Sequence, residues 1–183
     1  AALLAAVSAS VNKGGKILVA RNCHKAVYHA LYLRELQPVY IYPHEDQRLG
    51  INGGISPERV ERYLEENTDV QAVLLTSPTY DGVVSDIKTI AEVVHRHKIP
   101  LIVDEAHGAH LHYSKYFPVS AADLGADIVI QSFHKTLPSM TQTAVLHICS
   151  DMADVEKIKR FMGIYQTSSP SYICLLYTSD AAT

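Results

Sequence analysis

The chain has 183 residues, of which 48% are hydrophobic and 19% are charged, a balance that argues against intrinsic disorder. Its net charge of -3 excludes a broad basic surface for nucleic acid or an anionic membrane, and its apolar runs are far shorter than the roughly 18–20 residues that span a bilayer. Three scattered cysteines and the lack of a signal-peptide pattern at the start lead us to expect a soluble, cytoplasmic protein.

Apolar, β-branched runs alternate with amphipathic stretches along the chain. In chain order, the pattern predicts a helix body over 1–7, a strand over 17–20, a helix over 24–36, a strand over 39–42, a helix from Ser56 through 65, a strand over 72–76, a helix opened by Ser85 and Asp86, strands over 101–104 and 128–131, a sixth strand over 143–148, and a helix over 151–164. The strands are continuously apolar, as in sheets covered on both faces. This order predicts an α/β fold, a three-layer αβα sandwich with a mostly parallel sheet.

Both ends of the sequence look truncated. The helical composition of residues 1–7 has no capping residue before it, and residues 174–183 continue no helical period. We therefore expect residues 1–173 to be part of a larger domain and residues 174–183 to be a non-native or unstructured tail.

Polar clusters follow three of the predicted strands. They are the runs 76–82 (TSPTYDG), 104–110 (DEAHGAH) and 131–136 (QSFHKT). In a parallel sheet a ligand binds outside the carboxyl ends of the strands, so these clusters should share one site. An acid, hydroxyls, a lysine and histidines on one rim suit a phosphorylated cofactor that contains nitrogen.

Asp104 and Lys135 carry the most specific chemistry in these clusters. A carboxylate that closes a buried strand is costly unless it is paired, and a protonated pyridine nitrogen would offset that cost. Lys135 lies beside His134 and Ser132. In a partly desolvated pocket such a lysine can lose its proton and form a Schiff base, while Ser132 can donate to a phosphate.

These blocks resemble the pyridoxal-phosphate (PLP)-dependent Orn/Lys/Arg decarboxylases. The run 104–110 and, later in the chain, SFHKT at 132–136 carry the resemblance, and the runs 21–25 (RNCHK), 76–82 and 167–171 (TSSPS) match further blocks in the same order. The resemblance covers about residues 1–173, and the presence of these blocks in the same order makes it specific. It implies the aspartate-aminotransferase type of fold (fold type I) and places these residues in the large, PLP-binding domain.

The resemblance also implies roles for individual residues. Lys135 would form the Schiff base with PLP, Asp104 would pair with the pyridine nitrogen, and His24 would stack on the ring. Ala106 and His107 would line the ring, Ser132 would bind phosphate, and His134 would flank the lysine. Thr167 or Ser168 would reach the cofactor of a neighbouring subunit in a homodimer or larger homo-oligomer. The phosphate-binding turn and the small domain of the family have no counterpart in these residues.

Simpler interpretations compete with each of these roles. Lys135 could be a solvated lysine, Asp104 could cap the turn that follows it, and His24 could be a helix-terminal residue without a ligand. His107 and His110 lack cysteine or carboxylate partners at metal-ligand spacings, so we expect no metal site. His95 and His97 are expected at a solvated helix end.

A helicase-type NTPase is the rival from another functional class, because the letters DEAH also occur in its magnesium-binding box. That machinery needs a phosphate loop, and the nearest run, Gly14-Gly15-Lys16-Ile17, lacks the leading glycine and the hydroxyl. A catalytically dead scaffold is disfavoured by the presence of both Asp104 and Lys135. Among PLP enzymes, an aminotransferase or a carbon–carbon lyase is the alternative, since these share the lysine and the aspartate.

The sequence thus predicts a PLP-dependent carboxy-lyase that converts a small basic amino acid to the corresponding polyamine-type amine and CO2. The sequence Ala106-His107-Gly108 resembles that of the shorter, arginine-type members of the family. Arginine is therefore the first expected substrate, before lysine and ornithine.

Overall fold

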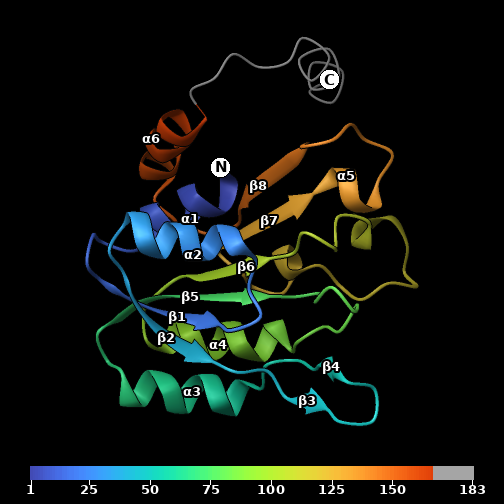
Figure 1. Cartoon of the computed structure of the whole chain (residues 1–183), viewed down its shortest axis with the longest axis horizontal. Helices are drawn as coiled ribbons and strands as arrows, with labels where there is room; N and C mark the ends of the chain where they lie inside the picture. Colours follow the sequence, from blue (N-terminus) through green and yellow to red (C-terminus); the bar gives the residue numbers. More distant parts are fainter. Residues whose placement is uncertain (167–183) are drawn as a thin grey trace.

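A computed structural model describes residues 1–166 of the chain. Its centre is a six-stranded sheet in the order β2-β1-β5-β6-β7-β8 (Figure 1). The strands are β1 (Lys16–Ala20), β2 (Gln37–Ile41), β5 (Val70–Thr76), β6 (Leu101–Asp104), β7 (Ile128–Ser132) and β8 (Ala144–Ile148). All neighbouring pairs are parallel except β7 and β8, which are antiparallel. The predicted mostly parallel α/β sheet is confirmed.

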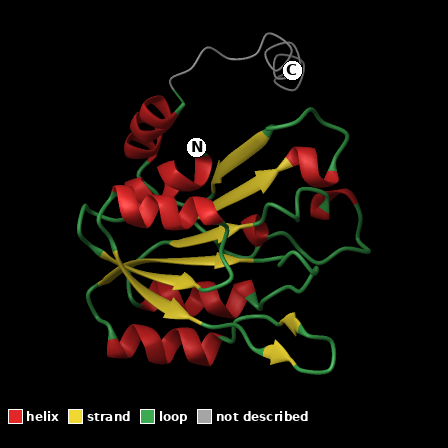
Figure 2. Cartoon of the chain, in the orientation of Figure 1, coloured by secondary structure: helices red, strands yellow, loops and turns green. Residues whose placement is uncertain are grey.

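Helices cover both faces of this sheet (Figure 2). They are α1 (Ala2–Ser10), α2 (Lys25–Leu33), α3 (Pro57–Glu66), α4 (Ile87–Arg96), the short α5 (Phe133–Thr136) and α6 (Val155–Tyr165). One buried cluster joins the sheet to α3 and α4, and a second joins its other face to α1, α2 and α6. The molecule therefore has the expected three layers, with each face of the central strands sealed from water.

Three helices are capped by a side chain at their start, two of them where the sequence predicts. The Ser56 hydroxyl accepts from the Arg59 N–H of α3, and Asp86 accepts from the Thr89 N–H of α4. Asp154 does the same for α6, three residues later than expected. The preceding residues form a turn in which the Ser150 hydroxyl bonds to Asp127 and accepts from the Met152 N–H.

Smaller elements were not predicted. The strands β3 (Glu45–Asp46) and β4 (Ile51–Asn52) form a hairpin of their own, and 3-10 turns occupy Leu111–Tyr113 and Ala121–Asp123. Two- and three-residue elements have no hydrophobic period to detect. No helix within residues 1–166 is long and apolar enough to cross a membrane.

His95 and His97 lie at the carboxyl end of α4, as expected, but His95 is only partly exposed to solvent. Its Nε2 lies 2.9 Å from Oδ2 of Asp127, a fully buried carboxylate at the start of β7. The same oxygen accepts from the Leu101 N–H at 2.7 Å, so this cluster joins α4, β6 and β7. A buried carboxylate needs such partners, and nothing in the sequence pattern marks Asp127 as buried.

Candidate active site

The carboxyl ends of the parallel strands meet at one edge of the sheet, as the sequence predicts. The register pairs Thr76 of β5 with Asp104 of β6, and Asp104 with Ile130 of β7. The segment that follows β1 brings His24 to the same edge, and α5 begins directly after β7. The three polar clusters of the sequence are therefore neighbours in space.

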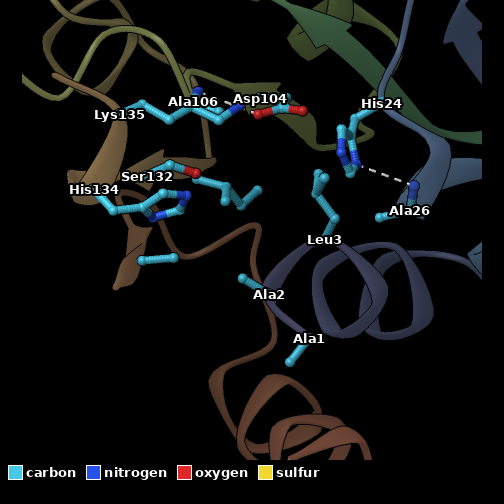
Figure 3. Close-up of a pocket in the computed structure, with 12 residues that line it drawn as sticks. Ala1, Ala2, Leu3, His24, Ala26, Asp104, Ala106, Ser132, His134 and Lys135 are labelled. Carbon is cyan, nitrogen blue, oxygen red and sulfur yellow. Dashed lines mark hydrogen bonds between the residues drawn. The ribbon is translucent and has the colours of Figure 1, made fainter. Parts of the chain in front are cut away.

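Two adjoining cavities lie at this edge, of about 240 and 620 Å³. His24, Asp104, Ala106 and Lys135 line both of them. The smaller cavity also contacts Ser132, His134 and the first residues of α1, and the larger one contacts His107. In Figure 3, Lys135, Ala106 and Asp104 lie along one side of the smaller cavity, and His24 lies across it from Ser132 and His134. The structure thus brings together all seven residues predicted for the site.

Asp104 is the buried charge of the site. It is 2% exposed, and its Oδ1 accepts a hydrogen bond from the Ala106 N–H at 3.2 Å. Burial raises the pKa of this carboxyl, while the Ala106 hydrogen bond and the positive charges of Lys135 and His24 act in the opposite direction. The simpler interpretation, in which Asp104 caps the following turn, therefore holds for Oδ1. This capping bond still allows the carboxylate to contact a partner in the cavity.

The three histidines of the site have defined ring orientations. Nδ1 of His24 accepts from the Ala26 N–H at 3.1 Å, so His24 is the N-cap of α2. Nδ1 of His134 lies 2.9 Å from the Thr143 carbonyl oxygen, which can only accept, so this nitrogen carries the proton. Nε2 of His107 lies 3.2 Å from Nζ of Lys135. Such contacts hold imidazole rings against rotation.

Asn22 and Thr76 were not singled out from the sequence as site residues. Both line the larger cavity, and Asn22 Oδ1 and Thr76 Oγ1 are buried without a hydrogen-bond partner in the described part of the chain. Unsatisfied buried polar atoms are costly, and a polar ligand would satisfy them. The sequence offered one signal for them: Asn22 comes just after β1 and Thr76 ends β5, so both lie at the carboxyl ends of strands.

The site fits PLP by its donor set. A buried carboxylate suits a pyridine nitrogen, a lysine faces the same cavity, and the orphaned oxygen atoms suit the polar substituents of the ring. The Ser132 side chain makes no capping hydrogen bond to α5, which leaves its hydroxyl to donate to an acceptor such as a phosphate. Within residues 1–166 no group of three or more metal-ligating side chains is assembled.

Glu105 has a different environment from its neighbour Asp104. Its carboxylate is 1% exposed and accepts from the Ser120 hydroxyl at 2.7 Å, the Gln131 side chain at 2.6 Å and the Ala121 N–H at 2.7 Å. Since all three donors belong to the protein, Glu105 anchors the loop that follows β6. The sequence did not reveal this role. Thr167 and Ser168, expected at a neighbouring subunit's cofactor, lie outside the described residues.

Solved structures similar to this chain include a PLP-bound putative aminotransferase from Clostridium difficile, with a TM-score of 0.70 and 14% identity, covering 90% of this chain and 43% of that one. The structure of TDC from Oryza sativa with PLP and tryptamine has a TM-score of 0.70 and 16% identity, covering 86% and 38%. At these identities the likeness shows the fold, which is the predicted fold type I.

Curated relatives are more similar in sequence. An arginine decarboxylase from Bacillus cereus is 37% identical over 181 residues, which cover 99% of this chain and 39% of that protein. The constitutive lysine decarboxylase of Escherichia coli is 27% identical over 184 residues, covering 92% and 25%. The chain thus spans well under half the length of these relatives. The model of the Orn/Lys/Arg decarboxylase major domain matches residues 1–183, and the chain belongs to this family.

Proposed function

We propose that this chain is the cofactor-binding part of a PLP-dependent decarboxylase that acts on a basic amino acid. The observation that carries the proposal is that a buried carboxylate, Asp104, and Lys135 line the same cavity at the carboxyl edge of the sheet. Arginine is the first candidate substrate, because the Bacillus relatives named arginine decarboxylase are more similar to this chain than the lysine decarboxylases are.

When bound, PLP supplies an electron sink for the negative charge left on Cα after CO2 departs. Asp104 would hold a proton on the pyridine nitrogen, because a buried carboxylate is best stabilised by a cation at contact distance. His24 would lie against the ring face, its orientation set by its bond to the Ala26 N–H. Asn22 and Thr76 would satisfy their buried oxygen atoms on the ring substituents.

Lys135 would hold the cofactor covalently through Nζ and release it to the substrate amine. His134 donates from Nδ1 to the Thr143 carbonyl oxygen, so its Nε2 is left to carry a proton to or from the reacting centre. Lys135 could carry that proton through Nζ instead. Ser132 and the free N–H groups in the first turn of α1, which lines the same cavity, would bind the phosphate.

An aminotransferase or a carbon–carbon lyase remains the second candidate, because those enzymes would use the same lysine and aspartate. Membership of the decarboxylase family favours the first proposal. We also propose that the protein is cytoplasmic and acts as a homodimer or larger homo-oligomer with shared sites, with no nucleic-acid or membrane partner. Residues 1–173 would form part of its large domain.

Borohydride reduction in the presence of PLP tests the proposal directly. Peptide mapping should find the pyridoxyl group on Lys135, and the Lys135→Ala variant should lose it. Lys88→Ala is the matched control, because Lys88 is exposed on α4, on the opposite face of the sheet. Labelling spread evenly over surface lysines in the full chain would contradict the proposal.

Product analysis separates the two candidates. A decarboxylase releases CO2 and the amine from arginine, lysine or ornithine and retains PLP. An aminotransferase converts the cofactor to its pyridoxamine form and releases an oxo acid. Accumulation of the pyridoxamine form without CO2 would favour the second candidate.

A further inference from the structure

The side chain of His107 connects the turn after β6 to Lys135 in α5. Its Nε2 lies 3.2 Å from Lys135 Nζ, and its ring meets the Tyr80 ring edge-on with 5.6 Å between centroids. His107 and Lys135 both line the larger cavity, together with Tyr80. The imidazole is therefore placed between a residue after β5 and the amine expected to react.

The turn that carries His107 is rigid. The Gly108 N–H donates to the Glu105 carbonyl oxygen at 2.8 Å, and a Cβ on Gly108 would come within 2.4 Å of the Glu105 side chain. Glu105 is itself held by the Ser120, Ala121 and Gln131 contacts. Because a buried anchor fixes the turn, the position of the His107 ring is set by the fold and not by a ligand.

The hydrogen bond between the two side chains has a defined direction. A lysine ammonium has three donors and no acceptor, so Nε2 of His107 is the acceptor and its proton lies on Nδ1. Burial lowers the pKa of His107, and the charges of Lys135 and His24 lower it further, so that the ring is neutral at neutral pH. Asp104 lies on the same cavity but is not a partner of this ring.

His107 is poorly suited to act as the base that removes the Lys135 proton. The ordinary pKa of a lysine ammonium lies about 4 units above that of an imidazole, so proton transfer between them is unfavourable by about 10⁴. Burial also lowers the pKa of His107, which makes its ring a weaker base. A neutral acceptor that orients Nζ requires no such transfer.

We propose that His107 is a positioning residue for Lys135: its Nε2 accepts a hydrogen bond from the lysine Nζ and so holds Nζ at the cavity. After Nζ has lost a proton to water, its lone pair can form a bond to an aldehyde carbon, and the carbonyl oxygen leaves as water. This inference rests on the proposed function, since it concerns the lysine that would bind PLP. The contact differs from the ring-lining role expected from the sequence, because it acts through the lysine.

Two substitutions separate the role of His107 as a hydrogen-bond acceptor from the packing of its ring. His107→Phe keeps a ring against Tyr80 but loses the acceptor, whereas the Oε1 of His107→Gln can replace Nε2 as an acceptor that does not titrate. The rate of covalent capture of PLP by Lys135 is followed by absorbance and confirmed by borohydride mapping in the full chain. We expect the Phe variant to be slowed about 10-fold or more and the Gln variant to remain within about 3-fold of the unmodified protein, since loss of orientation costs one to two orders of magnitude.

Nitrogen NMR of the protein without PLP gives a second measurement. Nε2 of His107 should be unprotonated and Nδ1 protonated at neutral pH, and Lys135→Met should remove this preference. Equal capture rates for the Phe and Gln variants, or a protonated Nε2 in the unmodified protein, would overturn the inference. Failure of Lys135 to capture PLP in the unmodified protein would instead overturn the proposed function, and the NMR result would still decide the role of His107.

Discussion

Asp104 and Glu105 are adjacent acids at the end of β6 with different surroundings. Asp104 faces a cavity lined by Lys135 and His24, whereas Glu105 is enclosed by donors from the protein. The alternating direction of side chains along an extended chain accounts for this separation. We therefore expect substitutions of Asp104 to affect catalysis and substitutions of Glu105 to affect the stability of the fold.

Asp104→Asn should abolish most turnover while leaving covalent PLP capture at Lys135 intact. The amide cannot hold a proton on the pyridine nitrogen by charge, so we expect kcat to fall about 100-fold or more, the loss typical of removing one fixed electrostatic partner of a transition state. Steady-state kinetics with borohydride mapping measures both quantities. Unchanged kcat would contradict the assigned role.

Glu105→Ala should instead destabilise the fold. It leaves the Ser120 hydroxyl, the Gln131 side chain and the Ala121 N–H without their acceptor, which should cost about 3 kcal/mol or more. Urea unfolding of the variant beside Asp104→Asn measures the difference. Sequence alone suggests that Glu105 is the more dispensable acid, so rate comparisons of alanine variants need this stability control.

At the scale of elements, α2 is connected to the site through its N-cap residue, His24. His24 caps the helix by accepting from the Ala26 N–H and also lines both cavities. His24→Ala should lose both functions, whereas His24→Ser should restore the cap alone, since serine is a favoured N-cap residue.

We expect His24→Ala to lower stability by about 1 kcal/mol, equivalent to a Tm shift of roughly 2–4 °C, and His24→Ser to recover most of it. Both variants should bind PLP more weakly because neither has a ring to stack on it. Thermal unfolding and PLP titration provide the two readouts. A serine variant with unmodified PLP affinity would show that stacking is absent.

The sequence predicted elements well where their signals are local. Continuous apolar runs marked the strands of the main sheet, and Ser56 and Asp86 marked helix starts. The end of α2 was placed too late, at 36 instead of Leu33, because Glu35 makes the turn toward β2 with a φ of 54°, and no glycine signals it. The antiparallel direction of β8 depends on tertiary packing and was not predicted.

The site could be predicted to a similar extent. Asp104 and Lys135 stood out because strand-end position and chemistry coincide at both residues. Asn22, Thr76 and the hydrogen bond from Lys135 to His107 did not, because amides, hydroxyls and histidines have many ordinary roles and only their burial or geometry distinguishes them. Residues far apart in the chain have to be placed before such contacts can be seen.

At the scale of the whole molecule, the two edges of the sheet are built differently. At the amino end of β7, buried Asp127 is satisfied by the Leu101 N–H, His95 and Ser150. At the carboxyl end, within residues 1–166, Asp104 has one side-chain hydrogen bond, from the Ala106 N–H, and Asn22 and Thr76 have buried atoms without partners. The carboxyl edge therefore stores unfavourable free energy that a ligand would relieve, as is common at active sites.

This imbalance predicts a pH dependence of stability for the protein without PLP. Burial raises the pKa of Asp104 above its ordinary value of 3.8, so the folded state binds the proton more tightly than the unfolded state does. Its stabilising contribution is complete below pH 3.8 and is lost as pH rises through the raised pKa. Asp104→Asn, which cannot ionise, should therefore have a higher Tm than the unmodified protein at neutral pH, and the difference should shrink toward pH 4.

Thermal unfolding of both proteins across pH 4–8 checks this expectation, with PLP as the second variable. PLP should raise the Tm of the unmodified protein more than that of Asp104→Asn, because a pyridinium nitrogen offsets the buried charge only where the carboxylate is present. A Tm difference that does not change with pH would mean that Asp104 ionises without cost in the folded state. The edge would then owe its ligand affinity to Asn22, Thr76 and Lys135 alone.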